Sequence, residues 1–132
     1  DKVYPSAKAA LDSILKRGDT VCVGGFGLGG IPETLLNEVS SKDFDSDVQE
    51  LTVASLTAGV DGFGLGRLFE SGRVKRMISS YVGENKNFES MFLEGKIEVE
   101  LTPQGTLAAR MRAAGSGVPA FFTPTGAGTI YA

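Results

Sequence analysis

Short apolar runs alternate with amphipathic segments along most of this sequence. The runs are rich in β-branched residues and are bounded by Gly, Pro, Asn or Ser, which is typical of buried strands. The amphipathic segments repeat apolar residues at spacings of three and four, which is typical of helices. The runs predict strands at residues 20–24, 51–55, 74–81, 96–101 and 120–123. The segments between them, together with one before the first strand, predict helices at residues 6–17, 65–71, 85–95 and 105–114, and another that begins at residue 32.

This alternation predicts the architecture. Strands that are separated by helices pair in parallel, because each helix carries the chain back to the same end of the sheet. We therefore expect an α/β fold, in the form of an open, mostly parallel sheet with crossover helices, Rossmann-like in class. A complete domain of this class usually follows its last strand with a helix. No helix is predicted after residues 120–123, so we expect an incomplete domain.

Composition matters mainly for the functions that it excludes. The length of 132 residues suits one domain. The net charge is -3, and the 13 Lys and Arg residues form no block longer than a pair, which argues against a nucleic-acid partner. No apolar stretch approaches the roughly 18 residues of a membrane span, so no membrane association is expected. Residues 40–50 are polar and charged and predict a surface loop.

The chain has no histidine and a single cysteine. The absence of histidine removes Ser–His and Cys–His catalysis and every zinc site that needs imidazole, and we expect no metal site. Cys22 lies within an apolar run at residues 21–23. We therefore predict that it is a buried core thiol and not a nucleophile.

Three predicted turns leave the carboxyl ends of strands, where open α/β sheets hold their ligands. Residues 24–30 are glycine-rich, so their backbone N–H groups can approach a ligand closely, and the helix after them would point its N-terminus at an anionic group. Pro103 is unfavourable inside a helix or a strand, which predicts a turn with Gln104 at its tip. The candidate site residues from the three turns are Gly24, Gly25, Phe26, Gly27, Ser55, Leu56, Thr57 and Gln104.

A dinucleotide site is one alternative for this glycine-rich turn. Residues 25–30 match the three spaced glycines of that fingerprint. The fingerprint also requires an acidic residue at the end of the second strand to hold the ribose. Here that end reads Ser55, Leu56, Thr57, without a carboxylate.

Charged residues elsewhere leave two further alternatives open. Glu84 and Glu89 could supply a carboxylate for chemistry, or could belong to the first turn of a helix that Asn85 caps. The basic residues at 75–76 and 110–112 could contact phosphate, or could lie on solvated edges of the fold.

Four longer segments resemble the type I coenzyme A transferases. They are residues 24–33 (GGFGLGGIPE), 80–89 (SYVGENKNFE), 98–107 (EVELTPQGTL) and 117–126 (GVPAFFTPTG). Several long motifs in order are far more specific than one glycine pattern. The resemblance is to the N-terminal, α-type half of these enzymes. It implies that residues 1–132 are the N-terminal part of an α-type domain whose β-type half is absent.

The resemblance implies a ping-pong transfer of coenzyme A from succinyl-CoA to a 3-oxo acid such as acetoacetate, as in ketone-body utilisation. In this family a glutamate of a Ser-Glu-Asn-Gly motif in the β-type half forms a glutamyl-CoA thioester. The motif does not occur here, so this chain alone is expected to be inactive. Gln104 matches the glutamine that helps to form the oxyanion hole. Coenzyme A is then a substrate, and no bound cofactor is expected.

The resemblance also implies the partners and the compartment. The partners are acyl-CoA, small carboxylic acids and a β-type half or subunit, in a homodimer or heteromer. The mitochondrial matrix is the expected compartment, with the bacterial cytoplasm as the alternative. One departure bears on function, because the family usually has Ser-Asn-Asn-Ala-Gly where this chain has Leu56 and Thr57. Leucine cannot donate a hydrogen bond, and the alternative function is a non-catalytic binding or assembly module.

Overall fold

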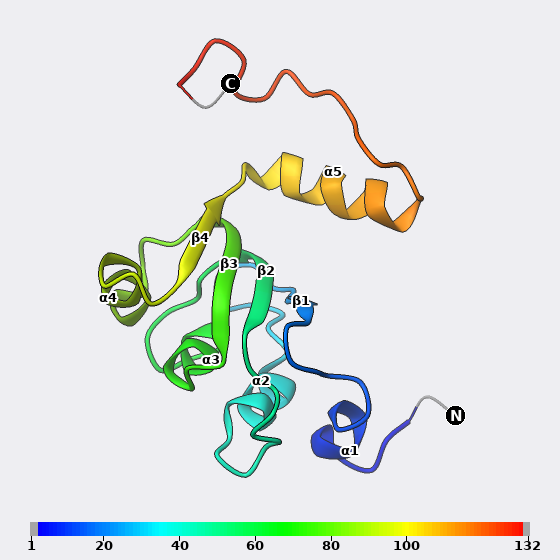
Figure 1. Cartoon of the computed structure of the whole chain (residues 1–132), viewed down its shortest axis with the longest axis vertical. Helices are drawn as coiled ribbons and strands as arrows, with labels where there is room; N and C mark the ends of the chain where they lie inside the picture. Colours follow the sequence, from blue (N-terminus) through cyan, green and yellow to red (C-terminus); the bar gives the residue numbers. More distant parts are fainter. Residues whose placement is uncertain (1–2, 131–132) are drawn as a thin grey trace.

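The computed structural model describes residues 3–130, and its strands form one fully parallel sheet (Figure 1). In spatial order the strands are β1 (Thr20–Cys22), β2 (Leu51–Thr57), β3 (Val74–Tyr81) and β4 (Glu98–Leu101). The register places Val21, Val53, Met77 and Val99 side by side across the sheet. The predicted α/β class with a parallel sheet is confirmed.

Helices connect these strands in the predicted order. They are α1 (Ala7–Leu11), α2 (Glu33–Ser40), α3 (Leu65–Glu70), α4 (Lys86–Leu93) and α5 (Gln104–Gly115). The Ser6 hydroxyl caps α1 by accepting the backbone N–H of Ala9, as predicted. The helix ends well before residue 17, where the prediction placed its end. No helix within residues 3–130 is both long and apolar enough to cross a membrane.

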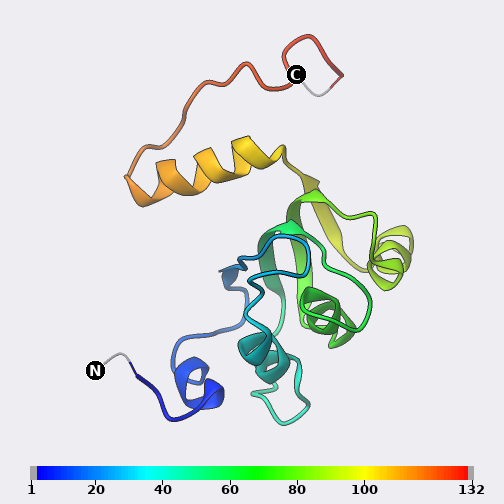
Figure 2. The same cartoon turned by 180° about the vertical axis from the view of Figure 1, so that it is seen from behind.

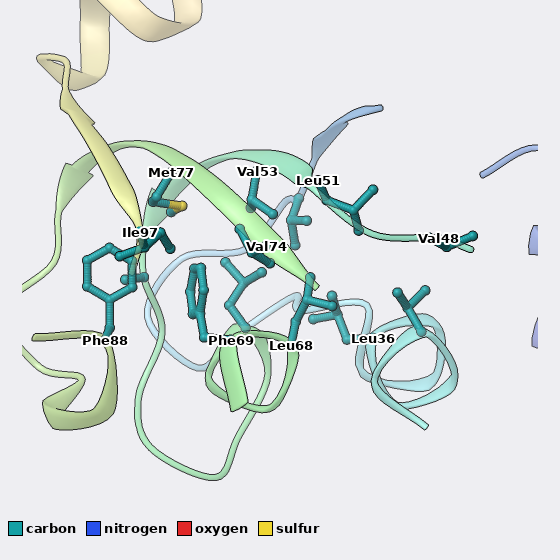
Figure 3. Close-up of a cluster of buried hydrophobic side chains, with 14 of the residues drawn as sticks. Leu36, Val48, Leu51, Val53, Leu68, Phe69, Val74, Met77, Phe88 and Ile97 are labelled. Atoms are coloured by element: carbon teal, nitrogen blue, oxygen red, sulfur yellow. The ribbon is translucent and has the colours of Figure 1, made fainter. Parts of the chain in front are cut away.

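The hydrophobic core lies between one face of the sheet and the helices α2, α3 and α4 (Figure 3). Phe69 of α3 and Phe88 of α4 meet edge to face, with ring centroids 4.8 Å apart. Burying each such side chain contributes about 1.5–3 kcal/mol. The largest fully buried apolar side chains are those of Phe69, Phe88, Leu51, Leu68, Met77, Val48 and Val53.

Cys22 is exposed, so the prediction of a buried core thiol was wrong. Successive side chains of a strand point to opposite faces of the sheet. Val21 faces the core, whereas Cys22 lies on the other face, in register with Ala54 and Ile78. Helices α2, α3 and α4 pack against the core face and not against the face that carries Cys22. Because β1 is also an edge strand, the thiol is exposed to solvent within residues 3–130.

Three other sequence predictions also failed. Residues 120–123 form no strand, because no neighbouring strand is hydrogen-bonded to them within residues 3–130. β2 continues to Thr57, so Leu56 and Thr57 belong to the strand and not to the turn after it. Phe92 was expected on the inner face of α4 together with Phe88 and Met91, but its side chain is 51% exposed.

The surface loop predicted at residues 40–50 is confirmed in part: residues 41–50 connect α2 to β2, but Phe44 and Val48 are buried. The loop is organised around a buried arginine. Arg73 is 5% exposed, and its guanidinium donates hydrogen bonds of 2.7 to 3.2 Å to the backbone carbonyls of Ser41, Phe44, Asp45 and Val48. The guanidinium also lies 5.6 Å from the ring centroid of Phe44. A buried charge is tolerated only when it is well hydrogen-bonded, and here four carbonyl oxygens accept hydrogen bonds from the two terminal nitrogens of the guanidinium.

Helix α5 is attached differently from the other four. It leaves the carboxyl end of β4 and lies apart from α1 to α4, with residues 118–130 continuing beyond it (Figures 1 and 2). Leu107 is the residue of α5 that is buried. On the sheet, the carboxylate of Glu100 accepts hydrogen bonds from Arg76 of β3 and Arg110 of α5. An ion-pair cluster therefore joins the helix to two strands.

Replacement of Arg73 should destabilise the complete protein strongly. Arg73→Ala leaves several carbonyls without their donor, and we expect the free energy of unfolding to fall by about 2–4 kcal/mol. Chemical denaturation measures this change. Lys75→Ala, at an exposed position in β3 two residues after Arg73, is the matched control and should change stability by less than about 0.5 kcal/mol. Equal effects of the two variants would contradict this account of the loop.

The Glu100 cluster should make stability depend on pH. The hydrogen bond from Arg110 is the main cause that lowers the pKa of Glu100 below its usual 4.5, and Arg76 adds to it. Because the folded-state pKa is depressed, the ionised carboxylate stabilises the fold above pH 4.5, and this contribution is lost as the pH falls through the lower folded pKa. Denaturation curves between about pH 6 and about pH 3 should therefore show a smaller loss of stability for Glu100→Gln than for the parent. A parent and variant with the same pH profile would contradict the assignment.

Candidate functional site

All four strands point the same way, so the turns at their carboxyl ends lie along one edge of the sheet. We call this edge the carboxyl rim. It consists of residues 24–30 after β1, 58–64 after β2, 82–85 after β3 and 102–103 after β4, together with the strand ends and Gln104 beside them. Every candidate site residue predicted from the sequence lies on the carboxyl rim.

The first glycine-rich turn is a narrow loop closed by its own backbone. The N–H of Phe26 donates to the carbonyl of Gly29 at 2.9 Å, and the reverse bond measures 3.0 Å. Gly25 has a φ of 127°, and a Cβ there would lie 3.1 Å from the side chain of Ile31, so only glycine suits this position. Phe26 and Leu28 project from the loop and are 77% and 61% exposed. The loop therefore presents two apolar side chains to solvent, while the N–H groups of Phe26 and Gly29 are bonded within the loop.

The turn after β2 is a second small loop, bridged between Val60 and Phe63. Asp61 ties this loop to α4, because its two carboxylate oxygens accept the backbone N–H groups of Lys86 and Asn87. The buried Asn85 side chain completes the link by donating to the carbonyl of Ala58 and accepting from Phe88. Asn85 therefore caps α4, as one of the two alternatives predicted.

The two loops abut at a small cavity of about 20 Å³. This volume is enough for about one water molecule and too small for an organic ligand. Ser55 and Thr57 line it from β2, and the Thr57 hydroxyl accepts the N–H of Gly59 at 3.2 Å. The complete lining consists of Val23, Gly24, Gly25, Gly27, Ile31, Ser55, Thr57, Gly59 and Leu65. The structure thus brings five of the eight predicted site residues together.

Gln104 lies at the other end of the carboxyl rim. It is the first residue of α5, which begins directly after Pro103, so it occupies a helix N-terminus and not the tip of an open turn as predicted. Its side chain is exposed. Because β1 and β4 are separated by three strand spacings, the turns after them lie about 14 Å apart across the sheet. A ligand that meets both Gln104 and Gly25 must extend along the rim.

Sequence reasoning missed the turn between these two ends. Tyr81 is the last residue of β3, is paired in register with Thr57, and is half exposed. Its phenol packs against Gly83, where a Cβ would lie 3.1 Å from the hydroxyl oxygen. The signal was available, because β3 was predicted with the correct end and its turn must reach the same rim. Tyr81 adds a polar aromatic group between the glycine loops and Gln104.

A repeated pentapeptide was also missed. Gly-Phe-Gly-Leu-Gly occurs at residues 25–29, in the turn after β1, and again at residues 62–66, from the turn after β2 into the start of α3. The phenylalanine has a different place in the two loops. The backbone bridge joins Phe26 to the later residue Gly29 in the first loop, and joins Phe63 to the earlier residue Val60 in the second. In the second copy Gly66 packs so tightly that a Cβ would collide with the carbonyl of Val60. The repeat marks both loops of the rim.

Two of the remaining charged candidates are held by one structural partner. Arg76 and Arg110, from the two basic segments, share the carboxylate of Glu100. The carboxyl end of β2 has no acidic residue before Asp61, and Asp61 is bound to α4. Within residues 3–130, no group of three or more Cys, Asp or Glu side chains is placed to hold a metal ion.

A wide hollow of the described residues lies away from the rim. It measures about 480 Å³ and is lined by residues of α2, α3 and the loop at 41–49, including Lys42 and Arg67. No predicted site residue lines it. The position of the strand ends, and not the size of the hollow, therefore locates the candidate site.

Comparison with known proteins gives close relatives. A succinyl-CoA:3-ketoacid coenzyme A transferase subunit from Xanthomonas campestris pv. campestris (strain B100) is 56% identical over 131 residues, covering 99% of this chain and 52% of that protein. The corresponding subunit from Helicobacter pylori (strain J99) is 53% identical over 132 residues, covering 100% and 55%. A probable subunit of the same name from Bacillus subtilis (strain 168) is 53% identical over 131 residues, covering 99% and 53%. This chain spans about half the length of these relatives.

Solved structures agree with this comparison. The acyl-CoA transferase YdiF from E. coli O157:H7, solved as a thioester complex with CoA, superposes with a TM-score of 0.79 at 27% sequence identity, covering 93% of this chain and 25% of that chain. The family model described as Coenzyme A transferase matches residues 4–132. The chain belongs to the coenzyme A transferase family.

Proposed function

We propose that this chain is the N-terminal part of the α-type domain of an enzyme that transfers coenzyme A from succinyl-CoA to a 3-oxo acid such as acetoacetate. The observation that carries this proposal is identity of 53 to 56% over nearly the whole chain to proteins named as subunits of succinyl-CoA:3-ketoacid coenzyme A transferase. The composition of the carboxyl rim supports it, with a glycine-rich loop at one end and the exposed amide of Gln104 at the other.

The proposed reaction proceeds through a carboxylate of the β-type half. A glutamate oxygen attacks the thioester carbon of succinyl-CoA and the C–S bond breaks. This step releases the CoA thiolate and forms a succinyl-glutamyl anhydride. The thiolate then attacks the glutamyl carbonyl, which releases succinate and leaves a glutamyl-CoA thioester. The same steps in reverse, with acetoacetate as the acceptor, give acetoacetyl-CoA and free glutamate. No oxidant and no bound cofactor is required.

The role proposed for this chain is to bind the substrates and to stabilise the negative charge that develops during each attack. Each attack places negative charge on a carbonyl oxygen, and the Gln104 side-chain N–H is proposed to donate to that oxygen. The first glycine loop, with Gly24, Gly25, Phe26 and Gly27, is proposed to lie along the extended CoA substrate. Ser55, Leu56 and Thr57 are proposed to face the acid. Leu56 then offers an apolar surface where the family usually carries asparagine, which alters the contacts available to the substrate carboxylate.

The partner in this proposal is a β-type half or separate β-type chain. The relatives are each named as one subunit of the transferase, which supports a heteromer of unlike chains over a single fused chain. These relatives are bacterial proteins, which favours the bacterial cytoplasm over the mitochondrial matrix expected from the sequence. The alternative function is a non-catalytic assembly module, and an assay of CoA transfer by the complete protein distinguishes it from the transferase.

Replacement of Gln104 tests the proposed role directly. In the complete enzyme, with its β-type partner, Gln104→Ala should lower kcat for transfer from succinyl-CoA to acetoacetate by about 10²-fold or more, because one oxyanion donor is lost. The formation of acetoacetyl-CoA is followed by absorbance. Gln49→Ala, which alters a glutamine at the opposite end of the sheet, is the matched control and should retain the parent rate.

Two results would contradict the proposal in different ways. Absence of any transfer by the complete parent enzyme would overturn the proposed reaction. Transfer at the parent rate by Gln104→Ala, with unchanged thermal stability, would remove Gln104 from the mechanism while leaving the reaction intact.

A further inference from the structure

The turn that carries Gln104 is anchored at one carboxylate. Glu100 of β4 accepts hydrogen bonds from Arg76 and Arg110, and the Thr102 hydroxyl donates to it at 3.3 Å. Arg110 also reaches the Thr102 hydroxyl at 3.4 Å. The backbone N–H of Thr102 donates to the carbonyl of Ser79 at 2.9 Å. Strand β3, strand β4 and helix α5 therefore converge on Glu100.

Helix α5 has few other contacts that set its direction. Leu107 is its buried residue, and Arg110 lies three positions later on the same side of the helix. Gln104 precedes Arg110 by six residues, which is about 9 Å along the helix axis. Fixing Leu107 and Arg110 fixes the axis of α5. The axis in turn fixes the first residue, Gln104, relative to the carboxyl rim.

We infer that Glu100, acting through Arg110, is a positioning residue that holds Gln104 at the carboxyl rim. This inference rests on the role proposed above for Gln104. Glu100 does not touch substrate in this account, and it acts by setting the direction of α5.

The strength of the cluster suits a positioning role better than a stabilising one. The side chains of Arg76, Arg110 and Glu100 are 44%, 47% and 29% exposed, and ion pairs at such exposure contribute little to stability. Catalysis is more sensitive to geometry, because a displacement of about 1 Å can lower a rate by about 10²-fold. Loss of the cluster should therefore change kcat more than it changes unfolding.

The chain offers a matched control on the same helix. Arg112 lies two positions after Arg110, which at about 100° per residue places it on nearly the opposite side of α5. It forms no ion pair within the described residues 3–130. Arg110→Ala and Arg112→Ala remove the same charge from the same helix, and they differ in the contact with Glu100.

The test measures kcat and KM in the complete enzyme with its β-type partner for Arg110→Ala, Arg112→Ala and Glu100→Gln, each with and without Gln104→Ala. We expect Arg110→Ala and Glu100→Gln to lower kcat by about tenfold or more with little change in KM, and Arg112→Ala to match the parent. In the Gln104→Ala background, Arg110→Ala should cause no further loss, because both changes remove one interaction. Equal losses from Arg110→Ala in both backgrounds would overturn the inference.

Hydrogen exchange of α5 separates this inference from the function on which it rests. Arg110→Ala, but not Arg112→Ala, should raise the exchange rate of the α5 amides by about tenfold or more. If Gln104→Ala leaves kcat unchanged, the role proposed for Gln104 fails, and the exchange rates then show whether Glu100 still positions α5. Unchanged exchange in Arg110→Ala would overturn the positioning role itself.

Discussion

Parallel pairing of the four strands is the constraint on which the rest of this structure depends. Because every strand runs in the same direction, every connection must return across the sheet, and four successive turns emerge at one edge. Buried apolar contacts hold the sheet against α2, α3 and α4, and Arg73 fixes the loop at the opposite end. The core thereby keeps the turns of the carboxyl rim in place, although the rim itself is largely exposed.

The turns of the carboxyl rim are held with different strength. The loop after β2 is tied to α4 through Asp61 and Asn85, whereas the loop after β1 is closed by backbone bonds between Phe26 and Gly29. The start of α5 is held by Leu107 and by the cluster at Glu100. Since β1 and β4 lie about 14 Å apart across the sheet, a ligand that meets both the first loop and Gln104 must extend along the rim.

The pattern of apolar residues was sufficient to predict the sheet class, the full extent of β3 and the cap at Asn85. The pattern did not predict where a strand lacks a helix packed on one face or a second strand paired with it. Cys22 lies in an apolar run, but a three-residue edge strand leaves it on the face that α2, α3 and α4 do not cover. The run at 120–123 has strand propensity, yet a strand exists only when another pairs with it. The placement of Gln104 depended on Pro103, which starts a helix here and does not form the open turn expected. The roles of the site residues stay predictions.

Locating the CoA adduct by intact mass tests the central claim most directly, which is that this chain stabilises charge while the nucleophile lies elsewhere. The complete enzyme is incubated with succinyl-CoA, without acceptor, and its polypeptides are weighed and digested. The account predicts that coenzyme A is bound to a glutamate of the β-type half, and that the segment corresponding to residues 1–132 keeps its unmodified mass. A thioester on a carboxylate of this segment, such as Glu84 or Glu89, would contradict it.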